Sequence, residues 1–369
     1  MIFFESPTTD PYFNLALEEY MFENIKDETV FLLWQNSNTI VIGKYQNPAE
    51  EIDQHYVDAH QIRVARRLSG GGAVYHDKGN LNYTIITDVS ENPNFDFALF
   101  VQPVVKALAE FGITAEFNGR NDVTIEGKKF SGNSQYYRKN RVLHHGCIML
   151  DSNLETVANA LKVKPAKFES KSVKSVRSRV TCINDHASSP IQMEDFKNTL
   201  AKHLTAHSEK TAFSLTDDIL TDILSLRDQK YATWEWNYGH TPPYNVRVEK
   251  KFPAGIISAY LQTQNSRITS IQFFGDFFCK KDLHELERKL VGLRLDSSLL
   301  NILNGMHIEE YIHMITAENL YELIDSLTHF TSFLGVLRGI PLCSQSVPGR
   351  RLVADCDLFS KTAHKGSAC

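Results

Sequence analysis

A run of glycines and arginines between residues 66 and 82 has the composition of an anion-binding site. The segment reads RRLSGGGAVYHDKGNLN, so Gly70 to Gly72 follow the pair Arg66 and Arg67. Glycine has no Cβ, so its backbone N–H groups can approach a ligand closely. Such N–H groups can form a nest for phosphate or carboxylate, and guanidinium groups supply matching positive charge. The segment therefore predicts an anion-binding loop, although glycine triplets also occur in plain flexible turns.

The residues around the glycines favour the binding interpretation. Ile62, Val64 and residues 73–75 are β-leaning and apolar, which predicts that the triplet lies on a loop between two strands. Four polar side chains then follow within one short segment: His76, Asp77, Asn80 and Asn82. A solvent-exposed turn does not require this density of hydrogen-bonding groups.

A second polar stretch, GRNDVTIEGKKFSGNSQ, spans residues 119–135. It predicts a strand, a tight turn at Glu126-Gly127 and a returning strand. Because side chains alternate along a strand, Lys129, Ser131 and Asn133 are expected on one face. Lysines on strands mostly lie in solvent. A lysine held on a strand beside small polar residues would nevertheless be a rigid support for one charged contact.

Two further features accompany these stretches. Residues 167–179 carry five basic side chains among serines and almost no apolar residue, which predicts a mobile basic loop. Strand 142–150 is expected to place His144 and His145 on opposite faces.

The elements that must position these segments follow from hydrophobic spacing. Asp10 followed by Pro11 predicts a helix start, because aspartate caps free N–H groups and proline is tolerated in the first turn. The β-rich runs 30–34 and 39–42 predict a hairpin leading to the glycine loop. Further strands are predicted at 83–87, 113–117 and 123–125, and helices at 97–111, 154–161, 196–204 and 219–226.

The 369 residues are enough for two domains. Pro242 and Pro243 mark a boundary, after which a new pattern of strands and helices begins. We expect a larger domain over 1–245, a smaller one over 246–340 and an unstructured tail or extension over 341–369.

The overall charge and the cysteines narrow the function classes. The formal net charge of -5 argues against binding to nucleic acid or an anionic membrane. We expect no signal peptide, because the N-terminus lacks a basic region and a long apolar run, and no stretch reaches membrane-spanning length. The six cysteines are scattered without a C-x-x-C pair, which predicts neither a zinc site nor disulfides and suggests the cytoplasm.

Taken in order, the motifs resemble the lipoate–protein ligases. The resemblance rests on WQNSNTIVIGKYQNP, RRLSGGGAVYHDKGNLNYT, GRNDVTIEGKKFSGNSQ, HHGCIML and KSVRSRVT. It runs from about Tyr12 to Asn245 and continues more loosely to about Arg338. It implies an α+β fold, with a mixed-sheet catalytic domain of the biotin/lipoate ligase type, similar to class II synthetases, and a small α+β accessory domain.

The resemblance also implies the activity and the partners. Such an enzyme activates lipoate with ATP and Mg2+ to lipoyl-AMP, and passes the lipoyl group to a lysine of an acceptor protein. The acceptors would be lipoyl domains of 2-oxoacid dehydrogenase E2 subunits and the glycine cleavage H protein, and the enzyme would be a monomer. Because carboxylate attack on a phosphate joins two anions, fixed positive charge and backbone donors suit this chemistry.

The family motif carries specific roles to this chain. Arg67 matches an ATP-contacting arginine, residues Gly72, Ala73, Val74 and Tyr75 match the nucleotide loop, and Gly71 and Gly72 would contact lipoate. Lys129 matches the lysine that touches both ATP and the lipoyl carboxyl group, whereas Lys128 does not. Lys174, Arg177 and Arg179 fall on the loop that covers the adenylate.

No protein metal site is expected, because magnesium would be held mainly by the phosphates. Asn121 and Asp122 could reach the ion, or could equally be structural hydrogen-bonding residues at a strand start.

Rival hypotheses rest on two departures from the family pattern. Cys147 replaces a frequent threonine and Cys182 a frequent asparagine, and related octanoyl or lipoyl transferases use a cysteine thioester without ATP. Buried structural cysteines are the commoner case. A non-catalytic binder of lipoyl domains is a further alternative. DNA binding, as in bifunctional biotin ligases, is disfavoured by the acidic balance and by the absence of a helix-turn-helix segment before Met1.

Overall fold

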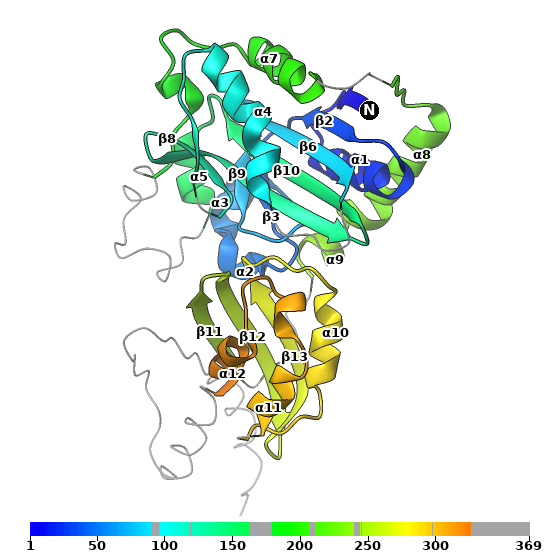
Figure 1. The fold of residues 1–369 in the computed structure, drawn as a ribbon, viewed down its shortest axis with the longest axis vertical. Coiled ribbons are helices and arrows are strands. Elements are labelled where there is room, and N and C mark those ends of the chain that lie inside the picture. Colours follow the sequence, from blue (N-terminus) through cyan, green and yellow to red (C-terminus); the bar gives the residue numbers. More distant parts are fainter. Residues whose placement is uncertain are drawn as a thin grey trace, which may run out of the picture. The chain divides into compact units, whose positions relative to one another are not determined.

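The computed structural model describes residues 1–89, 96–118, 120–161, 179–206, 211–239, 244, 246–296 and 298–325 (Figure 1). The predicted tail from 341 and the greater part of the basic loop lie outside these residues. Contacts divide the chain into two units, Met1–His240 and Thr241–Cys369. The sequence places this division slightly later, after residue 245. No helix in the described ranges is long and apolar enough to cross a membrane.

A mixed sheet of seven strands forms the centre of the N-terminal unit. All neighbouring pairs are antiparallel except β1 and β2, which are parallel. The strand order is β1 (Ile2–Glu5), β2 (Val30–Trp34), β6 (Asn80–Asp88), β10 (Arg141–Met149), β9 (Lys128–Arg138), β8 (Asp122–Ile125) and β7 (Glu116–Asn118). The predicted strand at 113–117 therefore forms only at its C-terminal end.

Helices cover both faces of this sheet, as expected for an α+β fold (Figure 1). On one face, α4 (Phe97–Glu110) and α7 (Met193–Thr205) share an apolar cluster with β6, β9 and β10. On the other, α1 (Pro11–Asn24) and α8 (Asp217–Leu226) pack against β2, β6 and β10. Helix α1 begins as predicted, because the Asp10 side chain accepts a hydrogen bond from Tyr12 N at 3.3 Å.

A second, three-stranded sheet carries the glycine loop. Its central strand β3 (Thr39–Ile42) pairs in parallel with β4 (Arg63–Arg66) and antiparallel with β5 (Val74–His76). Short helices α2 (Pro48–Glu51), α3 (Gln54–Ala59) and α5 (Leu154–Ala160) lie nearby, and residues of α3 and α5 join the apolar cluster of this sheet. Residues 67–73 connect β4 to β5, so the prediction of a glycine loop between two strands is confirmed.

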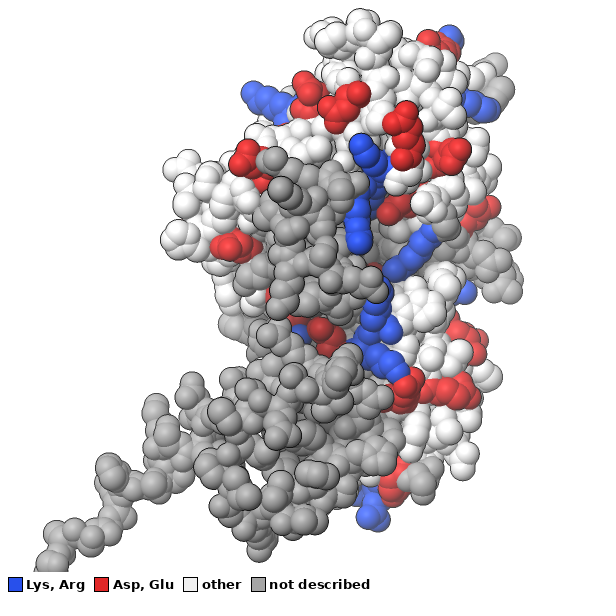
Figure 2. All heavy atoms as spheres, turned by 90° about the vertical axis from the view of Figure 1, so that its left-hand side faces the viewer, with Lys and Arg blue, Asp and Glu red and all other residues white. Residues whose placement is uncertain are grey.

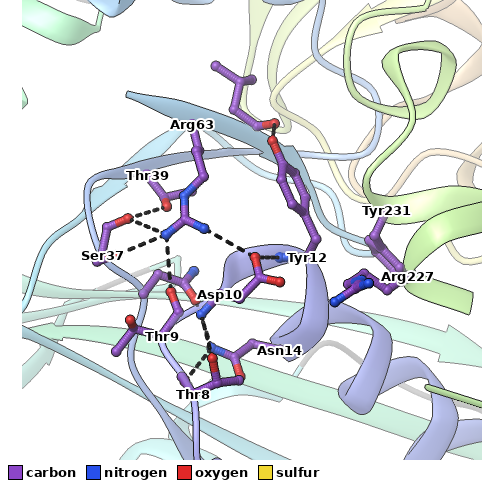
Figure 3. A network of polar contacts seen from close by, with 12 residues as sticks. Thr8, Thr9, Asp10, Tyr12, Asn14, Ser37, Thr39, Arg63, Arg227 and Tyr231 are labelled. Carbon is purple, nitrogen blue, oxygen red and sulfur yellow. Dashed lines mark hydrogen bonds and ion pairs between the residues drawn. The ribbon is translucent and has the colours of Figure 1, made fainter. Parts of the chain in front are cut away.

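The predicted hairpin of 30–34 with 39–42 is wrong. Strand β2 pairs with β1 and β6, whereas β3 belongs to the smaller sheet. The turn between them is anchored rather than free, because Asn36 is buried and bonded to Asn14 of α1 at 2.9 Å. Arg63 of β4 adds contacts to Ser37 of this turn and to Asp10 (Figure 3). These long-range contacts direct the chain from one sheet into the other.

The C-terminal unit is a smaller α+β domain. Its antiparallel sheet consists of β11 (Val246–Phe252), β12 (Gly255–Gln264) and β13 (Arg267–Gly275). The helices of this unit are α10 (Leu283–Leu290), α11 (Leu299–Asn304) and α12 (Ala317–Asp325). Strands followed by helices therefore begin after Pro242 and Pro243, as predicted.

Candidate active site

A cleft lies in the N-terminal unit between the α1 face of the large sheet and the glycine loop. It is open toward solvent, and the space between its walls, part of which is open solvent, is about 570 Å³. Six of the predicted site residues line it together: Arg67, Gly71, Gly72, Ala73, Val74 and Lys129. Tyr75 and Arg179 are not among the lining residues. The Tyr75 side chain packs in the cluster of the small sheet, and its hydroxyl donates to Asn38 Oδ1 at 2.9 Å. The fold thus brings the glycine loop and the strand of Lys129 to one cleft. What these two motifs bind stays a prediction.

The floor of the cleft is a row of residues on neighbouring strands. Trp34 of β2 pairs with Asn82 of β6, Asn82 with Cys147 of β10, and Cys147 with Gly132 of β9. All four line the cleft. Lys129 lies at the Gly132 end, where a Cβ placed on Gly132 would be 2.8 Å from Lys129 Nζ. The row therefore runs from a lysine at one end to a tryptophan at the other.

Arg67 holds the glycine loop in shape. Its guanidinium donates to the carbonyl oxygens of Gly70 at 2.6 Å and Gly72 at 2.8 Å, and to Val41 O at 3.2 Å. Ser134 of β9 also donates to Gly70 O, at 2.8 Å. Burial lowers the pKa of Arg67 to about 10, so it remains protonated at neutral pH. Because loop carbonyls are engaged by Arg67, the loop is rigidly placed beside the cleft.

Arg66 does not supply charge to the cleft, contrary to the expectation from the arginine pair. Its guanidinium donates to the carbonyl oxygens of five residues: Gly43, Lys44, Gln46, Trp236 and Asn237. Successive strand residues point to opposite sides, so only one of two adjacent arginines can face the cleft. Arg66 instead joins the segment after β3 to α9 (Trp234–Asn237).

Lys129 is held at the open end of the cleft. Its ammonium group lies 2.6 Å from the Asp122 carboxylate, and its side chain is 33% exposed. Its backbone N–H donates to Arg179 O at 2.8 Å, and its carbonyl accepts from Thr181 N at 2.9 Å. The C-terminal end of the predicted basic loop is therefore fixed beside Lys129, while Lys174 and Arg177 lie outside the described residues.

A bulge changes which residues share the face of Lys129. Strands β8 and β9 pair Thr124 with Lys129 but Val123 with Ser131, so one extra residue, Phe130, lies between them. Phe130 packs in the α4-side core. The extra residue shifts the alternation, so Gly132 and Ser134 share the cleft face with Lys129. For this reason the expectation is wrong for Ser131, which is not among the residues that line the cleft. Asn133 does line the cleft with Lys129, although its side chain accepts from Tyr83 on the α4 side.

A hydrogen-bonded network extends from Asn121 and Asn133, which line the cleft, to the α4 face of the sheet. Asn133 and Asn121 exchange side-chain-to-carbonyl bonds of 3.1 and 2.7 Å, and Tyr83 donates to Asn133 Oδ1 at 2.6 Å. His144 lies 3.2 Å from the Tyr83 hydroxyl and stacks on Phe100 of α4. His144 and His145 thus lie on opposite faces, as predicted. Burial lowers the pKa of His144 well below its usual range, so it serves as a neutral packing residue.

We expect Gly146→Ala to destabilise the protein through this network. A Cβ at residue 146 would be 2.3 Å from Asn133 Oδ1 and 2.5 Å from a ring carbon of Tyr83. Overpacking of this kind costs about 1–3 kcal/mol of unfolding free energy. Urea denaturation measures the change. Gly72→Ala is the control for stability, because a Cβ there meets nothing within 4 Å; equal stability of the two variants would contradict the packing argument.

Three residues that support the glycine loop were not predicted as site residues from the sequence: Glu18, Ser69 and His145. The Glu18 carboxylate accepts from His145 Nδ1 at 2.9 Å and from the Thr84 hydroxyl at 2.5 Å. His145 Nε2 lies 2.6 Å from Ser69 Oγ, which also accepts from Arg67 Nε at 3.1 Å. This chain joins α1 to the glycine loop beneath the cleft. The sequence gives one sign of Glu18. It lies three residues after Leu15 and four before Phe22, on a helix face that is otherwise apolar.

The two unusual cysteines occupy different environments. Cys147 lines the cleft. Cys182 is 4% exposed and is not among the residues that line the cleft, and its thiol donates to Ser152 O at 3.3 Å. Burial raises the pKa of Cys182 to about 12, so it is a thiol rather than a thiolate at neutral pH. The burial and protonation of the Cys182 thiol therefore argue against a thioester mechanism through this residue.

Figure 2 shows Lys and Arg side chains in a row on one face, with Asp and Glu side chains around them. Acidic and basic side chains both lie on the face drawn in Figure 2. Within the described ranges no group of three or more histidine, cysteine or carboxylate side chains could hold a metal ion. The positive groups that matter for the cleft are the single residues Arg67 and Lys129.

Comparison with known proteins finds one family along most of this chain. Residues 10–205 match the family "Lipoyl protein ligase A/B catalytic domain", and residues 241–324 match "Bacterial lipoate protein ligase C-terminus". Lipoate–protein ligase 1 of Staphylococcus aureus is 44% identical over 82% of this chain and 90% of its own length. Lipoate-protein ligase LplJ of Bacillus subtilis is 39% identical over 88% of this chain and 100% of its own length.

Solved structures share the fold. The crystal structure of lipoate-protein ligase A bound with ATP is 27% identical, with a TM-score of 0.56, and the match covers 64% of this chain and 97% of that one. A bi-partite lipoate protein ligase of Thermoplasma acidophilum is 29% identical, with a TM-score of 0.58, and the match covers 66% of this chain and 96% of that one. With two family matches and relatives aligned over most of its length, this chain belongs to the lipoate–protein ligases.

Proposed function

We propose that the cleft joins lipoate to ATP as lipoyl-AMP and then transfers the lipoyl group to a lysine of an acceptor protein. The observation that carries this proposal is that Lys129, Arg67 and the glycine loop face one cleft. Support comes from the similar lipoate-protein ligase A, whose structure was determined with ATP bound. Adenylate formation needs positive charge and backbone donors at the phosphate, and this cleft provides both.

In this proposal Lys129 is the catalytic residue. Its ammonium group would contact both the lipoyl carboxylate and the α-phosphate, which lessens the repulsion between the two anions. In the second step the same group would stabilise negative charge on the carbonyl oxygen as the acceptor lysine attacks. The Asp122 carboxylate holds the ammonium group in place beforehand.

The nucleotide would bind along the loop at Gly72, Ala73, Val74 and Tyr75, with Arg67 beneath it. Arg67 bonds to the carbonyl oxygens of Gly70 and Gly72, so its role would be partly to fix the loop. Tyr75 would contribute its backbone, because its side chain points into the core of the small sheet. The lipoyl group would pass Gly71 and Gly72 with its carboxylate at Lys129.

We expect Gly72→Ala to weaken ATP binding without affecting folding. The added methyl group would meet nothing within 4 Å, because that space is the cleft itself. If the nucleotide packs on the loop backbone, the KM for ATP should rise by about tenfold or more. Initial-rate kinetics at varied ATP concentration measure this. An unchanged KM would place the nucleotide elsewhere.

The basic loop would cover the adenylate. Arg179 lies directly beside Lys129 through a backbone hydrogen bond, and Lys174 and Arg177 precede it in the chain. A lid of this kind protects a reactive anhydride from water. Magnesium would accompany ATP and neutralise phosphate charge when bound. Asp122, 38% exposed beside Lys129, is the protein carboxylate that fits as a ligand for it, whereas Asn121 is engaged with Asn133.

The acceptor would be a lipoyl domain. The Thermoplasma ligase was studied with its E2 lipoyl domain. For this chain we propose E2 subunits of 2-oxoacid dehydrogenases and the glycine cleavage H protein as acceptors, with the ligase acting as a monomer. Residues 1–245 would carry catalysis and 246–340 the accessory domain.

The test is the mass of a purified lipoyl domain after incubation with this protein. Lipoate, ATP and magnesium together should add one lipoyl group, and omission of any one of them should add none. Modification without ATP would favour the thioester transferase, with Cys147 as the accessible thiol. Binding of the domain without modification would favour a non-catalytic binder.

A further inference from the structure

The Cys147 thiol lies in the middle of the cleft floor. Cys147 of β10 pairs with Gly132 on one side and with Asn82 on the other, and all three residues line the cleft. Gly132 has no side chain to cover the sulfur atom, and Cys147 is partly exposed. The thiol donates to Gly132 O at 3.6 Å, which is a weak contact. Molecules that enter the open cleft can therefore reach this sulfur atom.

Positive groups lie beside the thiol. A Cβ placed on Gly132 would be 2.8 Å from Lys129 Nζ and 3.9 Å from Cys147 Sγ, so the ammonium group and the thiol flank one point of the cleft. These distances are short compared with the electrostatic screening length of about 8 Å at physiological salt. Burial lowers the pKa of Arg67 to about 10, and a negative charge at Cys147 opposes this shift, so Arg67 is also within electrostatic reach.

These surroundings distinguish Cys147 from Cys182. Reactive cysteines typically lie in partly exposed, positively charged surroundings. Two carboxylates, Asp122 beside Lys129 and the buried Glu18 beneath the cleft, offset part of the positive charge. Cys182 is only 4% exposed, and its thiol is bonded to Ser152 O. Of these two thiols, only Cys147 is open to a reagent.

The neighbouring Asn82 amide offers a hydrogen bond to an occupant of this part of the cleft. Asn82 is 1% exposed, and its Oδ1 accepts from Asn80 Nδ2 at 3.1 Å. Its Nδ2 has no hydrogen-bond partner among the residues that the structure describes. An unpaired buried donor costs about 1–3 kcal/mol of stability. An adduct on Cys147 that carries carbonyl or carboxylate oxygens can supply the acceptor from the adjacent strand position.

We propose that Cys147 is a modification site, at which a small anionic disulfide forms a mixed disulfide that blocks acyl activation in the cleft. The Cys147 sulfur attacks one sulfur of the reagent, a new S–S bond forms and the original S–S bond breaks. The released thiolate takes up the proton that Cys147 has lost. Cys147 is thereby oxidised, and the departing sulfur of the reagent is reduced.

The effect on activity rests on the proposed function of the cleft. An acyl chain with its carboxylate at Lys129 that extends along the floor row toward Trp34 must pass Cys147. A group attached to the sulfur atom would occupy that path. Because a mixed disulfide is opened by a dithiol, the block should be reversible.

The first experiment measures the charge preference of the thiol by mass spectrometry of cysteine peptides. Iodoacetate is anionic and iodoacetamide is neutral, and both form an S–C bond at the thiol and release iodide. At Cys147 the ratio of their rates should be about threefold to tenfold higher in native than in urea-unfolded protein, because the positive groups attract the anion. Lys129→Ala should lower the native ratio, and Lys128→Ala, the matched control, should not.

The second experiment treats the protein with oxidised glutathione and follows lipoate-dependent ATP–pyrophosphate exchange. Wild-type exchange should fall in proportion to the fraction of Cys147 carrying glutathione, and dithiothreitol should restore it. Cys147→Ser should keep its own untreated rate. Cys279→Ser is the matched control, because Cys279 is partly exposed and belongs to the C-terminal unit. This variant should lose exchange as wild type does.

Three results would overturn this inference and leave the proposed function intact. They are a native ratio at Cys147 no higher than the unfolded one, a Cys147 that stays unmodified while other cysteines react, and full exchange by protein modified at Cys147. Absence of exchange in untreated wild-type protein would instead contradict the proposed function, and the alkylation ratios would still decide whether Cys147 is the reactive thiol.

Discussion

Lys129→Ala should abolish nearly all lipoate activation while the protein remains folded. The ammonium group lies at one end of the cleft floor, beside Gly132. Loss of one preorganised charge at a developing anion lowers kcat/KM by about a thousandfold. Stability should change little, because Lys129 and its partner Asp122 are both partly exposed. Lipoate-dependent pyrophosphate exchange and a thermal melt measure the two effects.

Lys128→Ala is the matched control for this variant. Lys128 is the preceding residue, is exposed and is not among the residues that line the cleft. Its substitution should leave exchange within about twofold of wild type, as expected of a surface position. If both substitutions reduced exchange equally, the assignment of Lys129 would fail.

Glu18→Ala should be strongly destabilising, by about 3 kcal/mol of unfolding free energy. The substitution would leave the Thr84 hydroxyl and His145 Nδ1 without their acceptor in a buried site. Because His145 also anchors Ser69 of the glycine loop, exchange should fall at temperatures at which the variant is still folded. Urea denaturation followed by circular dichroism gives the free energy.

Glu23→Ala, on the same helix, provides the comparison. Glu23 forms an ion pair with Arg138 on the surface, and such pairs contribute about 0–1 kcal/mol. Glu18→Gln keeps the shape and one acceptor oxygen, and should lie between the two. A loss in Glu18→Ala no larger than that in Glu23→Ala would show that the chain from α1 to the glycine loop does not stabilise the fold.

The local features of this protein could be predicted from its sequence because their causes are local. Asp10 and Pro11 start α1 through side-chain capping and proline geometry. The glycine run forms a loop because β-leaning residues flank it. The alternation of His144 and His145 follows from strand geometry alone.

The predictions that were wrong concern features that depend on contacts between residues distant in the sequence. The pairing of β2 and β3 with different sheets is supported by Asn14 and Arg63, which are far from the turn in sequence. The bulge at Phe130 arises between two strands and cannot be seen in the alternation of one. Arg66 and Arg67 are indistinguishable by type, and only the surrounding carbonyl groups decide which one faces the cleft.

The candidate site could be predicted only in part from the sequence, for the same reason. Recognisable motifs contain Arg67, Gly72 and Lys129. Glu18 instead lies on a helix face whose other residues are apolar and predict only core packing. The cleft also combines residues from β2, β5 and β6, so no single segment of the sequence predicts its full lining.

The most direct test of the account is exchange of labelled pyrophosphate into ATP by the wild-type protein in the presence of lipoate. We expect exchange that requires lipoate and that is lost in Lys129→Ala but retained in Lys128→Ala. Robust exchange by Lys129→Ala, or none by folded wild-type protein with lipoate and magnesium present, would contradict the claim that this cleft makes an acyl-adenylate.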